Sequence, residues 1–85
     1  MQIELHRNFI KSYGRLPKKI QEKFKERRTL FIENNFHPIL ENHSVEPTYP
    51  NWRSINITGD YRALFEIKEK NIIVFMKIGT HSELY

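Results

Sequence analysis

The chain has 85 residues, no cysteine and a formal net charge of +4. This length predicts one domain over residues 1–85, and the lack of cysteine excludes disulfides and thiolate metal ligands. The first residues lack the basic and apolar regions of a signal peptide, and no apolar run approaches the ~18 residues that a membrane span requires. We therefore expect a cytoplasmic protein that does not associate with membranes.

Positive charge is concentrated in the first third of the chain. Residues 1–28 carry nine basic and three acidic side chains, a net charge of +6, whereas the remaining residues sum to −2. Such asymmetry favours a polyanionic or acidic protein partner for this part of the molecule. The alternative is a charged helix face that is simply solvated.

The N-terminal half is predicted to form a strand and two helices. Gln2–Leu5 alternates polar and apolar residues, which is typical of a short strand. Apolar residues recur at helical spacing over residues 6–13, and Gly14 predicts the end of this helix as a C′ glycine. After Pro17, an apolar stripe opposite the basic residues predicts a long helix over residues 18–34.

The C-terminal half is predicted to form a loop and three strands. Residues 35–50 contain three prolines, so we expect a loop with one helical turn. Alternating residues over 52–58 and 61–68 flank a Gly-Asp turn and predict a hairpin. The apolar run 72–78 predicts a central strand, and a polar tail then holds His81 and Tyr85 close to the sheet edge.

The hairpin admits two registers. A two-residue turn at Gly59-Asp60 would place Ile57 opposite Arg62 and mix apolar and charged residues on one face. A three-residue loop, residues 58–60, instead pairs Ile57 with Tyr61 and keeps one face apolar. We expect this second register. The opposite, partly covered face then holds Ser54, Asn56, Arg62, Leu64 and Glu66.

Together these patterns predict an α+β fold. Two N-terminal helices should pack on one face of a twisted, mainly antiparallel four-stranded sheet, with the element order β-α-α-β-β-β. The other face should be concave and polar, and it should carry Arg62.

The ionisable residues favour acid–base chemistry without a metal. The chain has no nucleotide-phosphate loop, no zinc-peptidase motif and no nucleophile elbow. His37 and His43 lie six residues apart in a proline-rich loop, a spacing that is not typical of metal ligands, so we expect no metal site and no cofactor. His43, Asp60 and His81, with Arg62 as an anion stabiliser, suit RNA cleavage by its own 2′-OH, because the protein need supply only a base, an acid and positive charge.

Three segments of the chain carry a family resemblance. They are the Leu-Pro-x-x-Ile-Gln-x-x-Phe pattern at 16–24, the Ile-Thr-Gly-Asp-Tyr-Arg-Ala-Leu-Phe hairpin at 57–65, and the Ile-Gly-Thr-His-Ser-Glu-Leu-Tyr ending at 78–85. These segments resemble the RelE superfamily of bacterial type II toxins, in particular its YafQ-like branch. The resemblance implies a RelE-like fold and a ribosome-dependent mRNA interferase that cuts messenger RNA in the ribosomal A site and is neutralised by a cognate antitoxin.

The resemblance also implies catalytic roles. His81 matches the histidine that protonates the leaving 5′-oxygen, and Tyr85 matches the terminal aromatic residue that orients an A-site base. Arg62 matches the arginine of RelE that stabilises charge on the phosphate, whereas the YafQ-like branch has an apolar residue there. The general base stays open between His43 and Asp60.

Further residues are predicted to bind RNA. The YafQ-like branch carries a histidine where this chain has Asn56, which leaves the identity of the general base open. We expect Asn56 and Arg53 to contact substrate. Six basic side chains of the long helix should contact ribosomal RNA phosphates in a salt-dependent manner: Lys18, Lys19, Lys23, Lys25, Arg27 and Arg28. An antitoxin helix should cover this surface or the polar face of the sheet.

Two alternative functions remain open at this point. The first is a non-catalytic toxin that inhibits gyrase, like the ParE toxins of the same superfamily. The second is an RNA-binding or antitoxin-binding module whose nuclease site has decayed, and Asn56 is the residue that keeps this possibility open.

Overall fold

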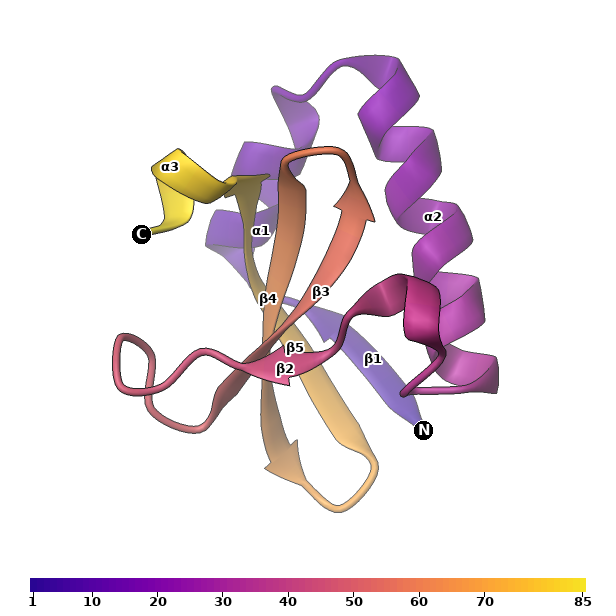
Figure 1. The fold of residues 1–85 in the computed structure, drawn as a ribbon, viewed down its shortest axis with the longest axis vertical. Helices are drawn as coiled ribbons and strands as arrows, with labels where there is room; N and C mark the ends of the chain where they lie inside the picture. The colour runs from indigo at the N-terminus through magenta and orange to yellow at the C-terminus, as the bar shows by residue number, and fades with distance from the viewer.

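The computed structural model describes residues 1–85 and contains one five-stranded sheet with helices packed against it (Figure 1). In chain order the elements are β1 (Gln2–Leu5), α1 (Arg7–Gly14), α2 (Lys18–Glu33), the 3₁₀ turn η1 (Pro38–Leu40), β2 (His43–Ser44), β3 (Trp52–Thr58), β4 (Tyr61–Glu69), β5 (Ile72–Thr80) and α3 (His81–Leu84). The helices lack the combination of length and apolar composition that a membrane crossing demands.

The sheet has the strand order β1-β5-β4-β3-β2. Strand β1 runs parallel to β5, and the other neighbouring strands are antiparallel. The predicted α+β class is therefore confirmed, with a mixed sheet and both long helices on one face (Figure 1).

Two short elements were not predicted. Residues 43–44 form a fifth strand against β3, and residues 81–84 form a helical turn instead of an irregular tail. A two-residue strand is too short to show alternation, and it forms because β3 offers an edge to pair with. The helical turn expected within residues 35–50 is confirmed as η1.

Helix α1 ends differently from the prediction. Gly14 is its last helical residue, and Arg15 follows as a right-handed cap with φ −92°. Two tight i→i+3 hydrogen bonds, from the Arg15 N–H to the Ser12 carbonyl and from the Leu16 N–H to the Tyr13 carbonyl, close the last turn at 3.1 Å. The prediction of a C′ glycine is therefore wrong.

The main core lies between the sheet and helices α1 and α2. Phe75 is at its centre, and its ring lies 5.3–6.1 Å from the rings of Phe9, Phe24, Phe31 and Phe65. All five side chains are almost fully buried. Edge-to-face and tilted pairs of this kind add to the stability that comes from burial alone.

The β3–β4 hairpin contains a β-bulge. Thr58 pairs with Tyr61 across a two-residue turn, and Asn56 pairs with Arg62, so Ile57 is the extra residue between them. The predicted three-residue loop, residues 58–60, and the predicted pairing of Ile57 with Tyr61 are therefore both wrong. The predicted face is nevertheless correct, because the bulge returns Ile57 to the buried side, where it is 0 % exposed.

Candidate active site

A shallow groove lies on the face of the sheet opposite α1 and α2. Its lining includes four predicted site residues, His43, Arg62, His81 and Tyr85. They come from β2, β4, α3 and the C-terminal residue, which lie far apart in the sequence. The strand order brings them together, because β4 lies between β3, which carries β2, and β5, which continues into α3.

One backbone carbonyl holds two of these side chains. Glu41 adopts a left-handed conformation, with φ 46°, at the end of η1. Its carbonyl oxygen lies 3.0 Å from Arg62 Nη2 and 2.8 Å from His43 Nδ1. Nδ1 has a second, longer contact, 3.3 Å to Arg62 Nη2, in which it would have to accept. A carbonyl can only accept, so the shorter contact favours the neutral tautomer with the proton on Nδ1, in which Arg62 does not donate to this nitrogen. This tautomer leaves Nε2 of His43 free to accept a proton.

A second contact fixes the guanidinium of Arg62. Its Nε donates to Oγ of Ser54, a residue that is 0 % exposed and that pairs with His43 across β2 and β3. Nε and Nη2 are thus held by the protein, while Nη1 has no protein partner and can donate to an anion.

Helix α3 places His81 by means of a capping box. The Glu83 carboxylate accepts hydrogen bonds from the Thr80 N–H at 2.7 Å and from Thr80 Oγ1 at 3.0 Å. These donors lower the pKa of Glu83. A Cβ atom at position 79 would lie 2.9 Å from Glu83 Oε1, so Gly79 leaves room for the cap. His81 begins the helix, and its N–H donates to the Asp60 carbonyl at 3.1 Å.

The aromatic ring of Tyr85 packs against the imidazole. The two ring centroids lie 4.7 Å apart at an interplanar angle of 41°, and the Tyr85 N–H donates to the His81 carbonyl at 3.1 Å. Tyr85 is 44 % exposed. An exposed ring beside a histidine offers a surface on which an unpaired base can stack.

Three other predicted residues do not line the groove. Asp60 is exposed at the hairpin turn, and Asn56 donates from its side chain to the Gly59 carbonyl at 3.3 Å. Arg53 points to the opposite face, where its Nε donates to Asn42 Oδ1 at 2.7 Å. Their contacts with substrate stay predictions.

The basic residues of α2 do not form one continuous stripe. Arg27 Nε donates to the Ile57 carbonyl at 3.0 Å, and the Arg28 guanidinium lies 5.5 Å from the centre of the Phe24 ring. Two lysines form ion pairs, Lys23 with Glu26 at 3.7 Å and Lys25 with Glu22 at 3.9 Å. Lys18 and Lys19 are exposed without such partners. Contact of these six side chains with ribosomal RNA stays a prediction.

Sequence reasoning missed the residues that support the groove. The alternation of β3 had placed Ser54 on the face of Arg62, but nothing indicated that its hydroxyl would be buried against the guanidinium. No sequence signal pointed to the carbonyl of Glu41, because any residue carries one. No three His, Asp or Glu side chains gather in a way that could hold a metal ion.

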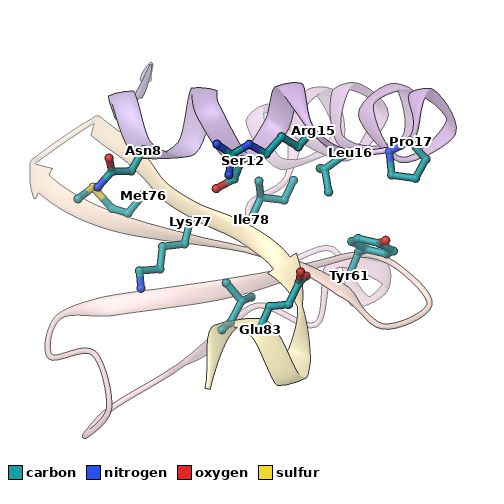
Figure 2. Close-up of a pocket in the computed structure, with 11 residues that line it drawn as sticks. Asn8, Ser12, Arg15, Leu16, Pro17, Tyr61, Met76, Lys77, Ile78 and Glu83 are labelled. Carbon is teal, nitrogen blue, oxygen red and sulfur yellow. The ribbon is translucent and has the colours of Figure 1, made fainter.

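A second groove runs between α1 and β5 and reaches α3 (Figure 2). Figure 2 shows Asn8 and Ser12 on α1 and Arg15 just after it, with Lys77 and Glu83 across from them. Its apolar lining comes from Leu16, Pro17, Tyr61, Met76, Ile78 and Leu84. This groove contains none of the four residues that meet in the first one.

The fold is shared with solved toxin structures. YafQ from E. coli strain BL21(DE3) superposes with a TM-score of 0.82 at 22% identity, covering 99% of this chain and 97% of that one. The YoeB/ParE toxin from Agrobacterium tumefaciens has a TM-score of 0.78 at 13% identity, covering 95% and 99%. The RelB-RelE antitoxin-toxin complex from Methanococcus jannaschii gives 0.76 at 19% identity, covering 96% and 94%.

Comparison of sequences identifies the family. No curated protein matches the chain in sequence. The model of the family described as ParE toxin of type II toxin-antitoxin system, parDE, matches residues 3–85. The fold is that of the YafQ, YoeB and RelE toxins, as the resemblance predicted. By its sequence the chain belongs to the ParE toxin family of type II toxin–antitoxin systems.

Proposed function

We propose that this toxin is an endoribonuclease that cleaves messenger RNA in the ribosomal A site without a metal, in the cytoplasm. The observation that carries the proposal is the single groove that His43, Arg62, His81 and Tyr85 share. It combines a proton acceptor, a proton donor, a fixed cation and an exposed aromatic ring. RNA cleavage through the 2′-OH requires these parts and no nucleophile from the protein.

The reaction follows from the position of each group. His43 Nε2 takes the proton of the 2′-OH, whose oxygen attacks the adjacent phosphorus. The bond from phosphorus to the 5′-oxygen breaks, and His81 donates a proton to that leaving oxygen. Arg62 stabilises the negative charge on the phosphate through its free Nη1, and Tyr85 stacks on a base. The products are a 2′,3′-cyclic phosphate and a 5′-hydroxyl.

Geometry favours His43 over Asp60 as the general base. His43 lines the groove with Arg62 and has its Nδ1 proton directed to the Glu41 carbonyl. Asp60 does not line the groove, and only its backbone carbonyl contacts His81. The role of Asp60 in this proposal is to anchor the start of α3.

A cognate antitoxin is the proposed protein partner. Two solved relatives of the fold are complexes with antitoxins, DinJ-YafQ from E. coli and RelB-RelE from Methanococcus jannaschii. The groove between α1 and β5 has apolar as well as polar lining residues, and its Arg15 and Lys77 form no ion pair within the chain. An amphipathic acidic segment of the antitoxin would match both properties.

The decisive experiment is primer extension on a reporter messenger RNA in a reconstituted translation reaction, with and without ribosomes. We expect ribosome-dependent cuts that slow by ~10²-fold or more in His81→Ala, because the leaving oxygen loses its proton donor. The matched control is His37→Asn, since His37 lies outside the groove and its Nδ1 accepts a hydrogen bond that asparagine can also accept. Intact message with the wild-type protein would contradict the proposal.

A further inference from the structure

Tyr49 links the loop before β3 to the end of the chain. Its Oη donates to the Leu84 carbonyl at 2.5 Å and lies 3.3 Å from Lys77 Nζ. Its ring stacks on Trp52 at 4.8 Å with an interplanar angle of 3°, and it meets the edge of Tyr85 at 6.1 Å. These contacts join the loop before β3 to β3, β5 and the C-terminal end of α3.

Helix α3 depends on contacts outside itself. It has only four residues, and a helix of one turn has no stability of its own in water. The capping box holds its N-terminal end at Thr80, and Leu84 anchors it by packing with Val45 and Leu64. At the C-terminal end, the hydroxyl of Tyr49 is the protein group that satisfies the Leu84 carbonyl.

Lys77 gives this hydrogen bond its direction. An ammonium group has only donors, so Lys77 Nζ can interact with Tyr49 Oη only by donating to it. The hydroxyl proton is then directed to the Leu84 carbonyl. The lysine also lies 5.1 Å from the centre of the tyrosine ring, a cation–π distance that favours the same ring position.

We propose that Tyr49 is a positioning residue of the nuclease site, an inference that rests on the proposed function. Its hydroxyl fastens the end of α3 to the β2–β3 loop and thereby sets the imidazole of His81 and the ring of Tyr85 relative to Arg62. Tyr49 does not line the groove itself. Without the hydroxyl, α3 turns about its capped end, and His81 spends less time where it can reach the leaving oxygen.

The test compares two substitutions that each replace a tyrosine by phenylalanine and so remove one hydroxyl group. Tyr49→Phe deletes the hydroxyl and keeps the ring on Trp52. Tyr13→Phe is the matched control, since Tyr13 Oη also donates to a backbone carbonyl, that of Gln21 at 3.1 Å, on the helical side of the molecule. We expect Tyr49→Phe to slow single-turnover cleavage by ~10-fold or more and Tyr13→Phe to leave it unchanged.

A second readout separates positioning from overall stability. Hydrogen exchange at the Tyr85 amide, which donates to the His81 carbonyl, reports on α3 directly. It should accelerate in Tyr49→Phe and not in Tyr13→Phe. Unchanged exchange at Tyr85, or a wild-type cleavage rate in Tyr49→Phe, would overturn the inference. A wild-type protein that leaves the message intact would instead overturn the proposed function, and exchange at Tyr85 would still decide whether Tyr49 fastens α3.

Discussion

The two faces of the sheet are held together by different interactions. On the helix-covered face, twelve buried apolar residues form one continuous cluster. On the other face only Val45, Leu64 and Leu84 form a buried cluster, with Tyr49 and Trp52 packed beside it. The candidate active site lies on this second, thinly covered face. Stability and function are thus assigned to opposite sides of the same strands.

The two faces differ in the directionality of their stabilising interactions as well as in the size of their buried clusters. Apolar burial on the helix side is non-directional, so it specifies that residues pack but tolerates several detailed arrangements. On the groove side, the Glu41 carbonyl and the Ser54 hydroxyl accept hydrogen bonds from Arg62, and the Tyr49 hydroxyl donates one to the Leu84 carbonyl, so single polar atoms are fixed. Substitutions on the helix side should therefore unfold the protein, and those on the groove side should reduce cleavage while the fold remains.

The largest effect on stability is expected from Phe75→Ala. This substitution removes the ring at the centre of the aromatic core and should lower the free energy of unfolding by about 3–5 kcal/mol. Urea denaturation followed by circular dichroism measures the loss. Met76→Ala, at the next and half-buried position of β5, should cost clearly less. Equal losses at both positions would contradict the central place of Phe75 in the aromatic core.

A smaller effect on stability but a clear effect on cleavage is expected from Ser54→Ala. Nε of Arg62 then loses its acceptor, and the guanidinium is held at one nitrogen instead of two, so cleavage should slow by ~10-fold while the protein stays folded. Single-turnover cleavage with the thermal midpoint measures both effects. Ser12→Ala, on α1, serves as the control, and equal cleavage rates in the two variants would count against the role of Ser54.

Acid should weaken α3 through Glu83. The Thr80 N–H and hydroxyl hold the pKa of this carboxylate below its ordinary value of 4.5. The stabilisation of α3 by the Glu83 carboxylate is therefore complete above the unfolded-state pKa and is lost as the pH falls through the folded-state pKa. The NMR shift of the Thr80 amide should report this transition in the wild type. Glu83→Gln should lack it, and an identical titration in that variant would contradict the capping role.

The smallest effect is expected from single lysines of α2. Lys19→Ala removes one exposed cation and should leave stability unchanged. If one phosphate contact is lost, the slope of log affinity for the ribosome against log salt concentration should become shallower by roughly 0.7–0.9. Lys25 already pairs with Glu22 at 3.9 Å, so Lys25→Ala should change the slope less. Filter binding over a salt series measures both. An unchanged slope in Lys19→Ala would contradict the prediction that this face of α2 contacts RNA.

Apolar periodicity predicted the helix-covered face because burial there follows from residue type. The stripe of α2 and the alternation of β3 and β4 placed Phe24, Ile55 and Phe65 in the core, where they are buried. Charge and family resemblance predicted His81 and Arg62, which do meet in one groove. The bulge at Ile57 was not predictable, because alternation specifies the face of a residue and not its partner.

Sequence patterns could not predict how the groove is supported. The Glu41 carbonyl is a backbone atom without a sequence signature, and its position depends on the left-handed turn after η1. The role of Tyr49 depends on a contact with Leu84, 35 residues away in the chain. Directional contacts between distant segments can be predicted only once the strand order is known. The sequence therefore indicated candidate residues, and the structure was needed for their geometry.

The most direct test of the central claim, that the groove catalyses attack by the RNA's own 2′-OH, uses a message with one 2′-deoxynucleotide at the cleaved position in the A site. The nucleophile is then missing while binding to the ribosome and to the groove is retained. Cleavage at that position should be abolished, while an all-ribose message in the same reaction is cut and yields a 2′,3′-cyclic phosphate and a 5′-hydroxyl. Continued cleavage of the deoxy-substituted message at the same position would contradict the claim.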